Sequence, residues 1–123
     1  MPRLPASPSG TEFRKPSKWP PLHGGLEGSN QIRFDNQEIR FDNQESIAVL
    51  VGVRNQGRGG DATVQPNSVH SMWVPDGRYS VYFHYLDGRD VVSTGREITL
   101  RRQNVTLQLR RQAAGNYPLR RLR

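Results

Sequence analysis

The chain has 123 residues, of which 33% are hydrophobic, and its 18 basic and 11 acidic side chains give a net charge of +7. It contains no cysteine, which excludes a disulfide framework and a thiolate metal site. No apolar run approaches the roughly 20 residues that a membrane-spanning helix needs, and no apolar signal segment opens the chain, so the default location is cytoplasmic or within an assembly.

Residues 1–30 are predicted to form an extended arm. Six of the nine prolines lie there, and because proline removes backbone donors while glycine loosens the chain, neither a long strand nor a long helix is expected. The large apolar residues Phe13, Trp19 and Leu22 are candidate anchors for a protein partner. The alternative is a linker that carries incidental aromatic residues.

Residues 31–45 contain the sequence IRFDNQE twice in succession and are predicted to lead into the folded domain, with a possible extra strand. A strand places Ile32 and Phe34 on one face, but a repeat of odd length turns the second copy to the other face of a continuous strand. Either two short strands reverse near residues 35–37, or one copy is ordered and the other is spare. The pattern fits a duplication without function, and it also fits two docking strips for the edge of a partner's sheet.

Residues 46–111 are predicted to form the folded domain, an all-β antiparallel β-sandwich or small barrel. About six apolar or alternating segments follow one another with turns every 8 to 12 residues and no convincing helix. SIAVLVGVR, which starts at Ser46, is apolar on both faces and suits a sandwiched strand. RYSVYFHYL, which starts at Arg78, alternates so that Tyr79, Val81, Phe83 and Tyr85 share a face, and Asp87 with Gly88 marks a hairpin after it.

The stretch VPDGRYSVYFHYLDG carries Pro75, Gly77, Tyr79 and Val81 in the order of a Pro/Gly turn before an aromatic strand. It resembles the corner of PEGA-like and transthyretin-like or carboxypeptidase-regulatory-like modules, which are small β-sandwiches, and the likeness covers residues 61–110. The resemblance implies that the first aromatic residue of the strand packs under the turn. It also implies a non-catalytic spacer or binding unit.

The excess of positive charge is confined to the end of the chain. Residues 1–45 and 46–100 are each neutral, whereas residues 101–123, which include a basic tail at 112–123, hold seven arginines and no acidic residue. Because guanidinium groups bind anions in a bidentate manner, these arginines are candidate contacts for nucleic acid or for an acidic protein, unless the tail only solubilises the chain. The candidates are Arg101, Arg102, Arg110, Arg111, Arg120, Arg121 and Arg123.

The sequence offers no arrangement of catalytic or metal-binding residues. His23 lies in the arm, His70 and His84 lie on predicted strands, and their spacing matches no metal motif. The chain lacks G-x-S-x-G, and its glycine-rich GRGG lacks the lysine and hydroxyl residue of a P-loop. We therefore expect a protein that is not an enzyme and that has no catalytic residue, metal or cofactor.

These features together predict a structural or assembly protein, or a protein-interaction module, whose terminal arms contact neighbouring subunits or a scaffold. By analogy, this organisation suits a component of a virion or another large complex. The expected partners are protein subunits, in a homo-oligomer or a larger assembly. The alternative is a nucleic-acid-associated protein that uses its arginine-rich C-terminal region.

Overall fold

The structure is a computed structural model that describes residues 15–26, 36–110 and 120–121. As predicted, all regular structure in these residues is β-strand, so they include no helix that could cross a membrane. The strands are β1 (Asn36–Asn43), β2 (Val49–Asn55), β3 (Arg58–Val64), β4 (Val69–Pro75), β5 (Gly77–Tyr85), β6 (Ser93–Thr94), β7 (Ile98–Leu100), β8 (Val105–Leu109) and β9 (Arg120–Arg121).

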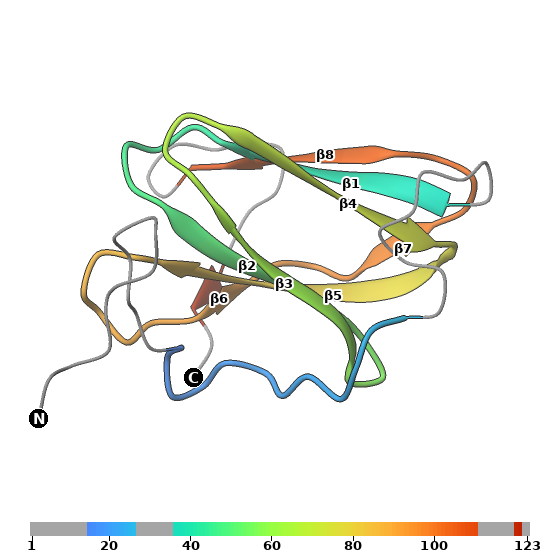
Figure 1. Cartoon of the computed structure of the whole chain (residues 1–123), viewed down its shortest axis with the longest axis horizontal. Coiled ribbons are helices and arrows are strands. Elements are labelled where there is room, and N and C mark those ends of the chain that lie inside the picture. Colours follow the sequence, from blue (N-terminus) through green and yellow to red (C-terminus); the bar gives the residue numbers. More distant parts are fainter. Residues whose placement is uncertain (1–14, 27–35, 111–119, 122–123) are drawn as a thin grey trace, which may run out of the picture.

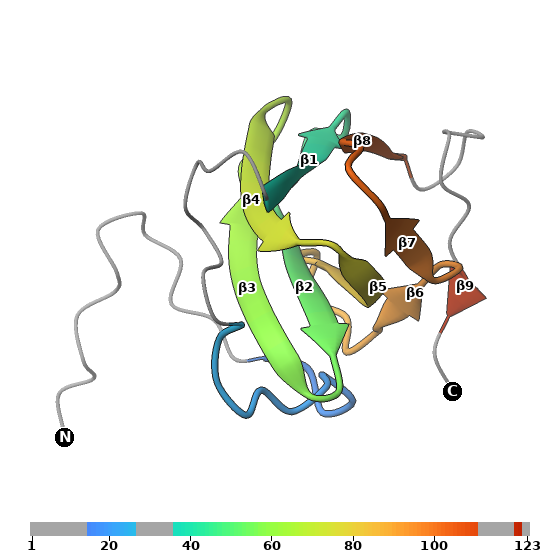
Figure 2. The ribbon, with the colours of Figure 1, turned by 90° about the vertical axis from the view of Figure 1, so that its right-hand side faces the viewer.

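The strands form two sheets that pack face to face (Figure 1, Figure 2). The short sheet has the order β4-β1-β8, and the broad sheet has the order β3-β2-β5-β6-β9, with β7 also paired to β5. All pairs are antiparallel except β1 with β8, which is parallel. The two sheets do not close on each other, so the sandwich is confirmed and the barrel is not.

The core fills the space between the two sheets. Phe41 of β1 meets Phe83 of β5 edge to face, with ring centroids 6.2 Å apart, and this contact joins the sheets. The alternation of β5 follows the sequence pattern, because Tyr79, Val81 and Phe83 are buried while the residues between them are not. The buried core cluster comprises Ile39, Phe41, Val49, Val51, Val53, Val64, Met72, Val74, Tyr79, Val81, Phe83, Tyr85, Ile98, Leu100, Leu107 and Leu109.

The duplicated segment supplies the central strand of the short sheet. β1 pairs with β4 on one side and with β8 on the other, and Ile39 and Phe41 of the second copy are fully buried. The strand runs without reversal from Asn36, since Asn36 and Gln37 already pair with Pro75 and Val74. The reversal considered for residues 35–37 is therefore absent at Asn36 and Gln37, while the rest of the first copy lies outside the described residues.

Asn43, at the end of β1, links the short sheet to the broad one. Its buried side-chain Nδ2 donates hydrogen bonds to the carbonyl oxygens of Ile47, Gln65 and Val64, at 2.8, 3.1 and 3.2 Å. Its Oδ1 accepts a hydrogen bond of 3.0 Å from the backbone N–H of Glu45. One amide thus satisfies backbone groups on both sides of the crossover, where the chain leaves the regular ladder.

The turn between β4 and β5 is closed by Tyr79. This side chain is fully buried, and its hydroxyl donates a hydrogen bond of 2.6 Å to the carbonyl oxygen of Pro75. Burial, with a further contribution from the nearby carboxylate of Asp76, raises the pKa of Tyr79 to about 12. Tyr79 therefore stays a neutral donor at physiological pH, and its ring lies under the turn.

β2 is buried on both faces, as its sequence predicts. The side chains of Val49, Val51 and Val53 point into the core, while Leu50 and Arg54 point to the outside of the broad sheet and are still only 3% and 5% exposed. Residues 15–26 lie over this outer face, where Arg54 contacts Pro20 and Pro21.

Candidate segment-binding face

Residues 15–26, called here the arm segment, lie along the broad sheet on the side opposite the short sheet (Figure 1, Figure 2). The segment has no regular secondary structure apart from a turn at Ser17 and Lys18. It meets β2, β3 and β5, which are the strands that carry its principal contacts. The outer face of these three strands, called here the receptor face, therefore binds an extended stretch of chain.

A glycine in β2 makes room for the tryptophan of the arm segment. The strand register places Gly52 between Asp61 of β3 and Tyr82 of β5, so these residues form a row across the sheet. Trp19 lies over this row, and a Cβ atom at Gly52 would stand only 2.7 Å from Trp19 Cζ2. The indole also meets Tyr82 edge to face, at a centroid distance of 6.4 Å. Glycine inside a strand here serves the close approach of another side chain.

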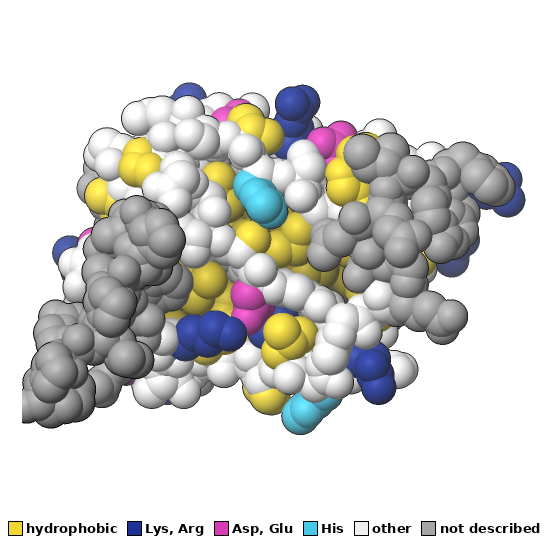
Figure 3. Space-filling view, in the orientation of Figure 1, with side chains coloured by type: hydrophobic (Ala, Val, Ile, Leu, Met, Phe, Trp, Pro, Cys, Tyr) yellow, Lys and Arg dark blue, Asp and Glu magenta, His cyan; other side chains and the backbone are white. Residues whose placement is uncertain are grey.

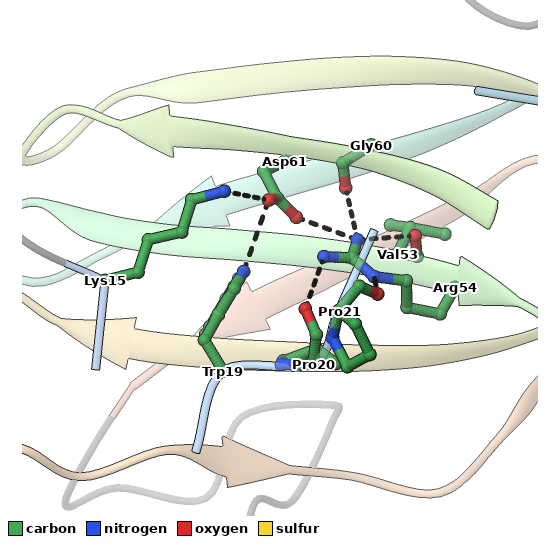
Figure 4. Close-up of polar contacts among 8 residues, drawn as sticks. All are labelled: Lys15, Trp19, Pro20, Pro21, Val53, Arg54, Gly60 and Asp61. Carbon is green, nitrogen blue, oxygen red and sulfur yellow. Dashed lines mark hydrogen bonds and ion pairs between the residues drawn. The ribbon is translucent and has the colours of Figure 1, made fainter. Parts of the chain in front are cut away.

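Asp61 is the polar centre of the face (Figure 4). Its Oδ2 accepts hydrogen bonds from Lys15 Nζ at 2.8 Å and from Trp19 Nε1 at 3.2 Å. Its Oδ1 lies 2.8 Å from Arg54 Nη1, in an ion pair without the alignment of a hydrogen bond. Burial raises the pKa of Asp61, but the contacts with Arg54, Lys15 and Trp19 outweigh this effect and hold the pKa below its ordinary value.

Arg54 binds the backbone of the arm segment. Its Nε donates a hydrogen bond of 2.9 Å to the carbonyl oxygen of Pro21, and its Nη2 donates one of 3.1 Å to that of Pro20. Nη1 donates to the carbonyl oxygens of Val53 and Gly60, which belong to the sheet itself (Figure 4). The guanidinium is therefore held by its own sheet in the orientation in which it meets two successive proline carbonyls.

Further contacts hold both ends of the arm segment. Near its start, the backbone N–H and the hydroxyl of Ser17 donate hydrogen bonds of 2.8 and 2.7 Å to Asp90. Near its end, His23 N–H donates to the carbonyl oxygen of Gly57 at 2.8 Å, and Gly59 N–H donates to that of Gly24 at 3.0 Å. Gly57 has a φ of 82°, and a Cβ there would stand 2.6 Å from the His23 ring. The β2–β3 hairpin is thus shaped to receive this backbone.

The three predicted partner anchors have different surroundings. Trp19 is partly buried against the sheet of its own chain, a contact that the sequence did not predict. Leu22 is 41% exposed and is one of two large hydrophobic residues exposed in the described part of the chain. Phe13 lies outside the described residues. Whether Trp19 or Leu22 also contacts a partner stays a prediction.

The predicted anion-contacting arginines are dispersed. Arg101 and Arg102 lie together after β7, whereas Arg110 follows β8 at its other end and donates a hydrogen bond to Gln44. Arg120 and Arg121 form β9 and pair with β6, and Arg111 and Arg123 lie outside the described residues. On the side of the molecule seen in Figure 3, the described charged side chains are of both signs and hydrophobic ones lie between them, so no basic stripe crosses this view.

The residues that build the receptor face were not singled out in the sequence. Gly52 and Arg54 interrupt an otherwise apolar strand, and this is the one local signal, since glycine in a strand often marks a close approach of another group. Asp61 follows a glycine-dense turn and gives no such signal. Its role depends on the pairing that sets it opposite Gly52.

The histidines do not converge. His84 is buried, with its Nδ1 2.9 Å from the carbonyl oxygen of Val91, whereas His70 and His23 are exposed. Among residues 15–26, 36–110 and 120–121, no group of three or more His, Asp or Glu side chains is placed to hold a metal ion.

Comparison of the chain with protein-family models, with curated proteins and with solved structures gives no match.

Proposed function

We propose that this protein is a non-enzymatic assembly module in which the outer face of the broad sheet binds an extended, proline-containing segment. The arm segment is the ligand of this face. In an isolated chain the face binds the arm segment of the same chain, and in an assembly it binds the arm segment of a neighbouring copy. The observation that carries the proposal is the contact of Arg54 with two successive proline carbonyls, next to the space over Gly52 that Trp19 occupies. This space is called here the Trp19 slot.

The contacts of the arm segment with the sheet resemble those of a receptor with a bound peptide, because the segment does not pair with the sheet as a further strand. Pro20 and Pro21 have no N–H and cannot add to a sheet, so their carbonyl oxygens are bound by a side chain instead. Specificity comes from a pocket for one aromatic residue and from a carboxylate that accepts hydrogen bonds from Lys15 and Trp19. Other domains that recognise extended proline-rich segments also bind them in grooves lined by aromatic side chains.

The length of chain between arm and domain supports exchange between copies. Nine residues separate Leu26 from Asn36, and a connection of this length spans at most about 33–36 Å when extended. A domain of about 100 residues has a radius of gyration of about 13 Å, so this reach is comparable to the size of the domain. Exchange of an identical element between copies keeps every contact and is a low-cost route to an assembly.

A mixing experiment with two full-length variants tests the proposal. Trp19→Ala leaves the receptor face intact but removes the main side chain of the ligand, and Gly52→Val blocks the slot but leaves the ligand intact. We expect each variant alone to be a monomer. In an equimolar mixture, the arm segment of the Gly52→Val variant should bind the outer face of the Trp19→Ala variant and so form a complex. Light scattering after size exclusion measures the masses, and NMR spectra of the two variants check that both are folded.

A peptide experiment gives a second measurement that does not depend on the folding of the Gly52→Val variant. A synthetic peptide of residues 15–26 should bind the full-length Trp19→Ala protein with 1:1 stoichiometry. The same peptide with Trp19→Ala should bind at least tenfold more weakly. Absence of peptide binding together with absence of a mixed complex would show that the face is only a packing surface for its own chain, and the proposal would be wrong.

A further inference from the structure

A second candidate site lies at the end of the sandwich where the β4–β5 turn meets the end of β7. A hollow of about 540 Å³ opens there. The register of β5 with β7 sets Arg78 opposite Thr99 and Gly77 opposite Leu100, which brings residues distant in sequence to one place. The residues that line the hollow are Asp76, Gly77, Arg78, Thr99, Leu100, Arg101 and Arg102.

The charge of the hollow is strongly unbalanced. Its lining residues include three arginines and one acidic residue, Asp76. Within the described part of the chain, the side chains of Arg101 and Arg102 form no ion pair or hydrogen bond, and Arg78 has only a 4.0 Å contact with the exposed Glu97. The lining residues therefore carry a net charge of +2, and two of the three arginines have side chains without a partner in the described part of the chain.

The backbone fixes the two consecutive arginines at the hollow. Arg102 has a φ of 53°, a left-handed conformation that residues with a side chain rarely adopt. The Arg102 N–H donates a hydrogen bond of 3.0 Å to Asp76 Oδ1, which ties this bend to the β4–β5 turn. Arg101 and Arg102 consequently line the same hollow instead of alternating along a strand.

We propose that this hollow binds a phosphate monoester. Guanidinium groups pair with phosphate oxygens in a bidentate geometry, and the net charge of the lining matches the charge of a monoester dianion. A phosphodiester backbone would need basic residues continuing along its path, but Arg110 lies at the opposite end of β8, a strand of five residues that spans roughly 16 Å. The compact cluster therefore favours one phosphate group over a nucleic-acid strand. This site is independent of the receptor face.

Titration of the full-length protein with phenyl phosphate tests the site, with the backbone amide signals of residues 99–102 as the readout. We expect saturable shifts in the wild type and at least tenfold weaker binding in Arg101→Gln/Arg102→Gln. The matched control is Arg40→Gln/Arg89→Gln, which removes the same charge from exposed positions outside the hollow and should change the affinity less than twofold. Equal losses in the two double variants would show unspecific charge attraction and overturn the proposal.

Asp76→Asn provides a test in the opposite direction. The asparagine keeps the oxygen that accepts the Arg102 N–H but removes the one negative charge of the lining, so phenyl phosphate should bind at least threefold more tightly. Unchanged or weaker binding would contradict the proposal. A phosphoserine peptide should bind like phenyl phosphate, whereas oligothymidylate without a terminal phosphate should bind at least tenfold more weakly per site. Equal or tighter binding of the oligonucleotide would replace the monoester with nucleic acid as the ligand.

Discussion

The amide of Asn43 illustrates how one side chain can fix the joint between two sheets. Its nitrogen lies within 3.2 Å of three carbonyl oxygens, and its oxygen accepts one N–H. Asn36 is the equivalent residue in the first copy of the repeat, but it lies at the start of β1 and pairs with Pro75. Identical residues thus have different surroundings because only one of them reaches the crossover.

We predict that Asn43→Asp lowers the free energy of unfolding at pH 7 by about 3–5 kcal/mol, because it places a buried charge against carbonyl oxygens and removes the donors that satisfied them. Urea unfolding measures the change. Asn104→Asp is the matched control, since the side chain of Asn104 is exposed and uses only its oxygen, to accept Glu38 N–H at 2.8 Å. This variant should stay within about 0.5 kcal/mol of the wild type. Similar losses in both variants would contradict the role given to the Asn43 amide.

At the scale of elements, two carboxylates bind the arm segment, in addition to the contacts of Arg54 with its backbone. Asp61 accepts from Lys15 and Trp19, and Asp90 accepts from Ser17. The hydrogen bonds from the hydroxyl and the backbone N–H of Ser17 lower the pKa of Asp90, as the contacts of Asp61 lower its own pKa. Asp90 receives the hydrogen bonds of Ser17, and Asp61 those of Lys15 and Trp19, only when the segment is docked, so docking and ionisation are linked, although Asp61 also keeps its ion pair with Arg54 of the sheet.

This linkage predicts release of the arm segment by acid. A carboxylate whose pKa is depressed in the docked state stabilises docking above its ordinary pKa, and the contribution is lost as the pH falls through the depressed value. Trp19 fluorescence should therefore change as the pH falls below about 4, where free carboxylates begin to protonate. In a Trp73→Phe background, with Trp19 as the remaining tryptophan, Asp61→Asn should shift the signal already at pH 7. An unchanged Trp19 signal in that variant would refute the role of Asp61.

At the scale of the whole molecule, two sheets and one extended segment form three layers, and the small core lies between the two sheets. The contact of Phe41 with Phe83 spans the inner layers, and the arm segment covers the outer face of the broad sheet. A core of this size gives only a few kcal/mol of net stability, so each large buried ring contributes a substantial share of it.

The two copies of the repeat allow a matched test of this contribution. Phe41→Ala should lower the free energy of unfolding by about 3–5 kcal/mol, because it opens a cavity between the sheets. If the Ile39 and Phe41 side chains of the second copy are sufficient for the core, Phe34→Ala should cost less than about 0.5 kcal/mol. Chemical denaturation of both variants measures the difference. A loss of several kcal/mol in Phe34→Ala would show that Phe34 also packs in the fold.

Much of the fold could be predicted from local sequence. The burial of β2 on both faces, the alternation of β5 and the turns at Pro75–Gly77 follow from the pattern of apolar residues and turn formers, which act over a few neighbours. The sequence could not place β1 in the centre of a sheet, because its pairing with β4 and β8 joins residues more than 25 positions apart. For the same reason, the sequence indicated Trp19, Arg101 and Arg102 as candidate contact residues but not the residues that strand pairing brings beside them.

The sequence by itself determined that the described part of this protein is built of strands, that its N-terminal region is rich in proline and carries Trp19, and that its positive charge is concentrated at the C-terminal end. These properties follow from side-chain chemistry and local backbone preference. Only the tertiary structure decided that Trp19 lies in a slot over Gly52, and that Arg78 joins Arg101 and Arg102 at one hollow. Strand order and register bring these groups together, and they result from packing over the whole core, which no short stretch of sequence encodes.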